Sequence, residues 1–326
     1  MAEWLYEDGI GEARAILVED GAIVEALIEL PGTLRAGTVA SGRLTAILVP
    51  GRRAIVTLDG GGEALVEPLP GALTEGARVT VEIVREAIPE AGRAKLPKAR
   101  FTEAVACEAP TLRDRLGDVV AVPSTGPDLF ERAGWSELLE QAVSGEIAFE
   151  GGALRMSITP AMTLFDVDGA LPPPALAVAG ARAVGQAIRR FDIGGSIGID
   201  LPTLPAREGR LAAAAALDAA LPQPFERTAV NGFGFLQIVR RRVRASLPEL
   251  LQADPAGAAA RALLRLAERT PGTGVRELIA APAVIACIAA QPDWIAALER
   301  RIGAPAVLRE APGLAIAAGH VHAAFR

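Results

Sequence analysis

The first hundred residues consist of short runs in which apolar and polar residues alternate, separated by glycine-rich turns. This alternation is typical of β-strands that bury one face. Residues 12–29 predict a hairpin that turns at Glu19-Asp20-Gly21. Four further runs follow it, over residues 37–49, 53–59, 63–68 and 77–86. Short strands at this spacing favour a small β-barrel.

After residue 100 the pattern changes to an alternation of helices and strands, and this mixed part following an all-β part predicts an α+β protein with several subdomains. Helical spacing predicts helices over 128–143, 175–190, 206–221, 233–246, 255–270 and 281–302. Segments 146–158, a second hairpin, and 161–171, 194–202, 225–230, 275–279, 305–309 and 313–324 are expected as strands. No internal repeat and no low-complexity linker separates these elements.

Two of the apolar strands end in aspartates. Asp166 and Asp168 are two residues apart and therefore share one face of a strand, while Asp200 closes the strand IGID. If the strands are neighbours, three carboxylates crowd together and require a cation or protonation. Oxygen ligands without nearby His or Cys suit Mg²⁺ or Mn²⁺. The alternative interpretation is that the three aspartates are turn residues or helix caps.

The net charge of -6 argues mildly against nucleic acid as a partner, but binding depends on where the cations lie. The richest basic cluster contains Arg240, Arg241, Arg242 and Arg244. On the helix expected there, residues 233, 236 and 239 form an apolar face and leave Arg241 and Arg242 outward. This helix face either is merely solvated or binds phosphate through the bidentate guanidinium groups. A lesser basic stretch contains Arg93 and Lys95.

Other motifs carry less chemistry. Cys107 and Cys287 lack CxxC spacing and are expected to be free thiols, and His320 and His322 have no third metal ligand in the sequence. The glycines of GGSIG precede a strand, which argues against a dinucleotide site. A secretory signal and an apolar run of roughly 18 residues are both missing, so we expect a cytoplasmic protein without a membrane span.

Three motifs in order, MTLFDVDG, RRFDIGGSIGIDLP and NGFGFLQIVRRRVRASL, resemble segments of the ribonuclease E/G family. The barrel that opens with GTVASGRLTAILVPGRR is similar to the RNA-binding barrel of that family. The resemblance implies a ribonuclease-H-like body from 1–31 with 106–158 and an inserted oligonucleotide-binding (OB) type barrel over 32–105. It also implies a deoxyribonuclease-I-like catalytic subdomain over 159–250 and a small α/β domain over 251–326.

The function implied by the resemblance is metal-dependent cleavage of single-stranded RNA. Asp166, Asp200 and Asp168 would be the catalytic and Mg²⁺-binding residues, although the family has Asn where Asp168 stands. The resemblance also implies RNA contacts, at Arg240, Arg241, Arg242, Arg93 and Lys95. The segment for a sensor of the RNA 5′ end and the paired-cysteine zinc link between subunits are missing, so we expect no zinc and, if a homodimer forms, no zinc link. The alternative is a catalytically degenerate RNA-binding relative.

Overall fold

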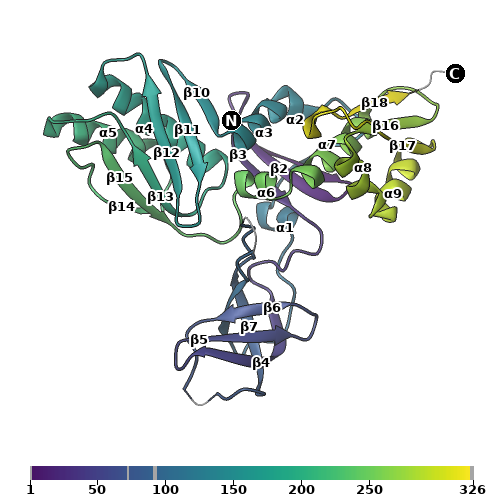
Figure 1. Ribbon diagram of the computed structural model, residues 1–326, viewed down its shortest axis with the longest axis horizontal. Helices are drawn as coiled ribbons and strands as arrows, with labels where there is room; N and C mark the ends of the chain where they lie inside the picture. Colours follow the sequence, from purple (N-terminus) through teal and green to yellow (C-terminus); the bar gives the residue numbers. More distant parts are fainter. Residues whose placement is uncertain (1, 72, 91–93, 324–326) are drawn as a thin grey trace. The chain divides into compact units, whose positions relative to one another are not determined.

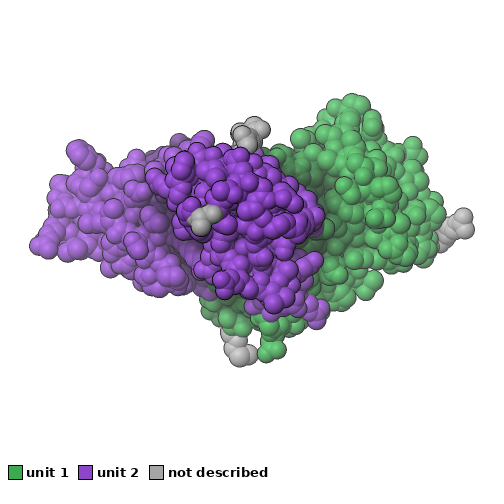
Figure 2. Space-filling model, turned by 90° about the horizontal axis from the view of Figure 1, so that it is seen from below, with its two compact units in different colours: residues 1–31, 116–136, 251–326 green, residues 32–115, 137–250 purple. Residues whose placement is uncertain are grey.

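The computed structural model describes residues 2–71, 73–90 and 94–323, and the chain divides into two compact units (Figure 2). The first unit contains Met1–Pro31, Leu116–Ser136 and Leu251–Arg326. The second contains Gly32–Arg115 and Glu137–Leu250. Within the described ranges the strands form four sheets accompanied by helices, which confirms the predicted α+β class.

The first unit begins with a four-stranded sheet of order β3-β2-β1-β9. Its strands are β1 (Glu3–Gly9), β2 (Glu12–Glu19), β3 (Ala22–Glu29) and β9 (Val120–Ala121). The hairpin expected over 12–29 is confirmed, and its turn residues Asp20 and Gly21 both have positive φ, as a two-residue hairpin turn requires.

A single body built from 1–31 with 106–158 predicts that this hairpin shares a sheet with the hairpin at 146–158, and that pairing is wrong. Residues Glu3–Gly9 form a strand that sequence reasoning did not identify, and this strand pairs along one edge of β2. The hairpin at 146–158 instead pairs with the strand that follows it in sequence. Alternation shows which residues form strands but does not specify their partners.

The remainder of the first unit is an α/β layer around the three-stranded sheet β17-β16-β18. Its elements are α2 (Leu129–Arg132), α7 (Pro255–Arg269), β16 (Arg276–Ala280), α8 (Pro282–Ala289), α9 (Pro292–Ile302), β17 (Ala306–Glu310), the 3₁₀ helix η1 (Ile316–Ala318) and β18 (His320–Ala323). The single helix expected over 281–302 is two helices, because Pro292 lacks an amide hydrogen and starts α9.

The second unit contains a closed five-stranded barrel, as the sequence predicted for the segment after residue 31. Its strands are β4 (Val39–Val49), β5 (Arg53–Leu58), β6 (Glu63–Val66), β7 (Arg78–Arg85) and β8 (Lys98–Phe101). The barrel core is aliphatic, with Val56, Val66, Val81 and Ile83 all fully buried. Phe101, the one aromatic residue among residues 32–105, packs against this core, so the barrel offers RNA no exposed aromatic ring.

The second unit also contains a six-stranded sheet of order β10-β11-β12-β13-β15-β14 (Figure 1). Its strands are β10 (Glu146–Phe149), β11 (Gly152–Ile158), β12 (Thr163–Gly169), β13 (Gly195–Asp200), β14 (Glu226–Arg227) and β15 (Phe235–Arg240). Helix α4 (Pro173–Arg190) packs on β11 and β12, and α5 (Arg207–Ala220) packs beside α4. Three helices each contain a residue at which the chain passes from one unit to the other: α1 (Leu112–Leu116), α3 (Trp135–Ser144) and α6 (Leu247–Ala253).

The prediction of a basic helix over 233–246 was wrong, because the first half of this segment is strand β15. Residues Phe235–Arg240 pair antiparallel with β13, and Leu236 and Ile238 enter the sheet core. The strand is preceded by Gly234, whose φ is +97° and where a Cβ would lie 2.2 Å from the Leu201 carbonyl oxygen. The apolar spacing also fits a helix, but β-branched and aromatic residues next to a glycine turn favour the strand.

Candidate functional site

The two strands that carry the aspartates are neighbours, which is the condition on which the shared carboxylate site depended. β12 and β13 are parallel, and Asp166 is the register partner of Asp200, the last residue of β13. On β12 the neighbours Phe165 and Val167 are buried while Asp166 is exposed, and Asp200 is exposed as well. Because successive residues of a strand point to alternate faces, both carboxylates lie on the same side of the sheet, Asp200 at the end of β13 and Asp166 beside it within β12.

That side is opposite the helix α4. Gly180 of α4 packs so closely on Val167 that a Cβ at this glycine would lie 2.3 Å from a Val167 methyl carbon. The other face carries a row of register partners across four strands, in the order Arg155, Asp166, Asp200 and Phe235. The two carboxylates therefore lie between a cation on β11 and an aromatic ring on β15, on a face that α4 leaves open.

A small apolar surface, here called the apolar floor, surrounds Gly198, which lies two residues before Asp200 on β13. A Cβ at Gly198 would meet the side chains of Leu164, Phe235 and Met162 at 2.7, 3.0 and 3.2 Å. These side chains close over the glycine, and a larger residue at position 198 would displace them. The acidic pair thus borders a small apolar surface.

Asp168 does not complete a three-carboxylate cluster, contrary to expectation. Its carboxylate oxygen Oδ2 lies 3.6 Å from a guanidinium nitrogen of Arg155, and both side chains are about 60% exposed. Among the described residues no group of three or more His, Cys, Asp or Glu side chains is arranged to hold a metal ion. Asp168 lies two residues beyond Asp166 on β12, and its register partner is Ala153, so it is displaced along the strand from the row that contains Asp166 and Asp200.

The arginine cluster lies at the opposite end of the same strands. Arg240 is the register partner of Gly195, the first residue of β13, whereas Phe235 is the partner of Asp200. Five residues of strand separate these rows, which corresponds to roughly 17 Å. The cluster therefore does not reach the phosphodiester that the two aspartates would contact.

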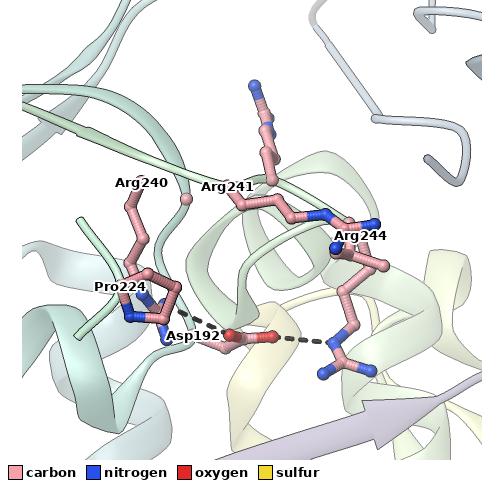
Figure 3. Close-up of a pocket in the computed structure, with 8 residues that line it drawn as sticks. Asp192, Pro224, Arg240, Arg241 and Arg244 are labelled. Atoms are coloured by element: carbon pink, nitrogen blue, oxygen red, sulfur yellow. Dashed lines mark hydrogen bonds and ion pairs between the residues drawn. The ribbon is translucent and has the colours of Figure 1, made fainter. Parts of the chain in front are cut away.

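Two of the expected RNA-binding arginines are held by carboxylates within the protein. Arg240 pairs with Asp192 at 3.4 Å and donates to the Ile193 carbonyl, and Arg244 pairs with the other Asp192 oxygen at 2.7 Å (Figure 3). Arg242 pairs with Glu249, which also accepts hydrogen bonds from Ser246. Arg241 is exposed and has no ion-pair partner among the described residues.

These arginines line a pocket of about 240 Å³. Its walls are formed by Asp192, Gly194, Pro224, Arg240, Arg241, Arg242, Val243 and Arg244. Asp192 has a φ of +52°, a left-handed conformation that aspartate tolerates better than most residues. The loop between α4 and β13 thereby places its carboxylate between two guanidinium groups.

The lesser basic stretch is only partly described. Arg93 lies outside the described residues. Lys95 forms an ion pair with Glu90 and donates to the Pro160 carbonyl oxygen at 3.2 Å, so its ammonium group is already engaged.

Two residues of interest were not found by sequence reasoning. Phe233 was placed on the apolar face of a helix, but it is 82% exposed in the turn that leads into β15. Asn231 shapes this turn, because its side chain accepts from the amides of Phe233 and Phe235. The Asn-Gly pair before Phe233 is a turn signal that could have revealed it. Asp192 gave no local signal, since its partners are about fifty positions away in the chain.

Comparison with protein-family models and with curated proteins finds no match for this chain. The resemblance to the ribonuclease E/G family therefore stays a prediction that depends on the motifs. No helix in the described part of the chain is long and apolar enough to cross a membrane.

Proposed function

We propose that this protein is a metal-dependent endoribonuclease that cleaves single-stranded RNA, related to the ribonuclease E/G family. The observation that carries the proposal is the direct register pairing of Asp166 with Asp200 on the open face of the sheet. Two like charges on neighbouring strands about 5 Å apart repel each other, and a bound cation would relieve the repulsion. Such a pair on an exposed surface, where it forms no structural contact between the two carboxylates, favours a catalytic role over a structural one.

The carboxylate pair fits magnesium or manganese. Mg²⁺ in proteins is commonly held by one or two carboxylates, with water and substrate phosphate oxygens as its other ligands. Asp166 and Asp200 would be the two protein ligands, and their exposure leaves room for a phosphodiester. A metal held there supplies charge neutralisation of the phosphodiester and an activated water. Asp168 and Arg155 would act nearby, as an ion pair that sets the charge of the site.

Other parts of the second unit support an RNA substrate. The closed barrel is of a size that suits an OB-type domain, and the six-stranded sheet with α4 and α5 on one face suits a deoxyribonuclease-I-like subdomain. The apolar floor beside the carboxylates, formed by Leu164 and Phe235 over Gly198, would contact the ribose or base of the nucleotide at the cleavage point. In this interpretation the first unit would include the ribonuclease-H-like part.

The decisive experiment is cleavage of a fluorescent single-stranded RNA with Mg²⁺, with Mn²⁺ and with EDTA. The wild type should cleave with either metal and stop in EDTA. Asp166→Asn and Asp200→Asn should each abolish cleavage, whereas Asp118→Asn, an exposed aspartate of the other unit, should not. Circular dichroism would verify that each variant is folded. Cleavage by Asp166→Asn at the wild-type rate would show that the assigned site is wrong.

A second candidate function is RNA binding without catalysis. It is favoured by the pairing of Asp168 with Arg155, which leaves two carboxylates rather than three for a metal. Binding of the RNA in EDTA, combined with no cleavage in Mg²⁺ or Mn²⁺ at any enzyme concentration, would support this candidate. Cleavage lost in Asp200→Asn would exclude it.

A further inference from the structure

We propose that the arginine-lined pocket at the far end of β13 binds a second backbone phosphate of the RNA, at a fixed distance from the cleavage point. The proposal rests on the proposed function for its substrate, but the pocket is a separate site. It is formed by the loop after α4, the end of β15, the residues that follow β15, and Pro224 ahead of β14. None of these segments contributes a carboxylate of the pair.

The charge of the pocket favours an anion. Four of its eight lining residues are arginines, and Asp192 is the single acidic one. Glu249 neutralises Arg242 from outside the lining. Arg85 adds a further cation close by, and burial together with the charge of Arg242 lowers the pKa of its guanidinium. A local excess of guanidinium groups in a protein of net charge -6 marks this pocket as the place for a phosphate.

Contacts within the protein hold the guanidinium groups of Arg240 and Arg244 in place and leave some of their N–H groups available to a ligand. Arg244 uses only Nε to reach Asp192, and its two terminal nitrogens form no hydrogen bond among the described residues. Arg240 uses one terminal nitrogen for Asp192 and the Ile193 carbonyl. Asp192 thus acts as a positioning residue that fixes two guanidinium groups (Figure 3). The exposed Arg241 also lines the pocket and would bind the anion directly, because a guanidinium can bind phosphate through two parallel hydrogen bonds.

The spacing identifies the ligand as one phosphate of a longer chain. The pocket and the carboxylate pair are separated by roughly 17 Å along β13 and β15. A dinucleotide has a single phosphodiester and therefore cannot occupy both sites. An oligonucleotide of about ten nucleotides, within the range that single-strand-binding domains cover, can occupy both. The pocket should increase affinity for long RNA and leave the shortest substrates unaffected.

The test compares Arg241→Ala with the wild type on two substrates, a dinucleotide and an oligonucleotide of about ten nucleotides. Arg182→Ala is the matched control, because Arg182 is an exposed arginine on α4 without an ion pair among the described residues. We expect kcat/KM of Arg241→Ala to fall about tenfold on the long RNA through KM, and to be unchanged on the dinucleotide. The slope of log affinity against log salt should fall by about one for Arg241→Ala alone. Arg241→Lys, which keeps the charge, should recover part of the loss.

Binding in EDTA, followed by fluorescence anisotropy of labelled RNA, separates this proposal from the proposed function. If the wild type never cleaves but Arg241→Ala loses affinity for the long RNA, the pocket stands and the nuclease fails. Equal affinity and equal salt slopes for wild type and Arg241→Ala would overturn the pocket. Equal losses on both substrates would overturn it as well, because the residue would then act at the cleavage point. Stabilisation by inorganic phosphate, without any effect of Arg241→Ala on RNA, would assign the pocket to a free anion instead and also overturn the proposal.

Discussion

Asp166 on β12 and Asp200 on β13 are register partners in a parallel strand pair, and both carboxylates are exposed on the face that α4 does not cover. The next residue in the row is Arg155, the register partner of Asp166 on β11. Its guanidinium group lies 3.6 Å from Asp168. Arg155 also lies 3.8 Å from a carboxylate oxygen of Glu146, so this one exposed arginine is shared between two carboxylates beside the pair.

Removing that arginine should strengthen divalent-cation binding. In Arg155→Ala, Asp168 loses its ion pair and the three aspartates repel one another more strongly, so a cation gains more by binding. We expect Mg²⁺ to raise the melting temperature of the wild type. In Arg155→Ala the same rise should need a roughly fivefold lower Mg²⁺ concentration, which corresponds to about 1 kcal/mol of binding free energy. Thermal unfolding over a Mg²⁺ titration measures this. If the midpoint of the Mg²⁺ titration is the same in Arg155→Ala as in the wild type, the cation binds elsewhere. The same conclusion holds if Mg²⁺ still raises the melting temperature of Asp166→Asn.

The exposed ring of Phe233 should stack on a base of the RNA. The turn that carries it is fixed by Asn231 and by the close approach of Gly234 to the chain after Asp200. Phe233→Ala should weaken RNA binding by about 1–3 kcal/mol, the usual contribution of one stacked base. Phe233→Tyr should retain the affinity and Phe233→Leu should lose most of it, as measured by anisotropy in EDTA. If Phe233→Leu binds as well as the wild type, the ring does not stack.

Much of the site followed from local sequence pattern. The strands that carry Asp166 and Asp200 are short apolar runs, and each is followed by a helix, an order that favours parallel neighbours. The barrel was recognisable for a similar reason, because its alternating runs are separated by glycine turns. Features that depend on residues close in sequence were therefore predictable.

Features that depend on distant partners were not. Phe235–Arg240 has apolar spacing that suits either a helix or a strand, and its pairing with β13 makes it a strand. The ion pairs of Arg240 and Arg244 with Asp192 join residues about fifty positions apart, so the sequence suggested free cations where the structure has paired ones. The sheet partners of the two hairpins could not be predicted either, because the alternating pattern of each hairpin is compatible with any free strand edge.

The buried ion pairs of Glu12 in the first unit should make that unit sensitive to a single substitution. Glu12 is only 3% exposed and accepts from Arg261 at 3.0 Å and from Arg265, both also buried. Glu12→Gln removes the charge that compensates two buried guanidinium groups. Breaking a buried pair of this kind destabilises a protein by about 3–5 kcal/mol. Urea denaturation measures the loss, and Glu277→Gln, which breaks the exposed pair with Arg309, is the control expected to change little. A similar small change in both variants would contradict this account.

Glu268 should make the stability of the first unit depend on pH. Its side chain is 1% exposed, its Oε1 accepts from Arg301 at 2.7 Å, and its Oε2 is buried without a hydrogen-bond partner among the described residues. Burial raises the pKa of Glu268, an effect that the charge of Arg301 only partly opposes. The folded state therefore binds the proton more tightly than the unfolded state does.

The sign of the pH dependence follows from that difference. Glu268 contributes its full stabilisation below the ordinary glutamate pKa, and this contribution is lost as pH rises from that value through the raised one. Glu268→Gln cannot titrate, so the free energy of unfolding of the wild type minus that of Glu268→Gln should decrease over this window and then level off. Urea denaturation of both proteins at a series of pH values measures the difference. A difference that increases with pH would mean that the ion pair with Arg301 outweighs burial, and that the pKa of Glu268 is lowered instead.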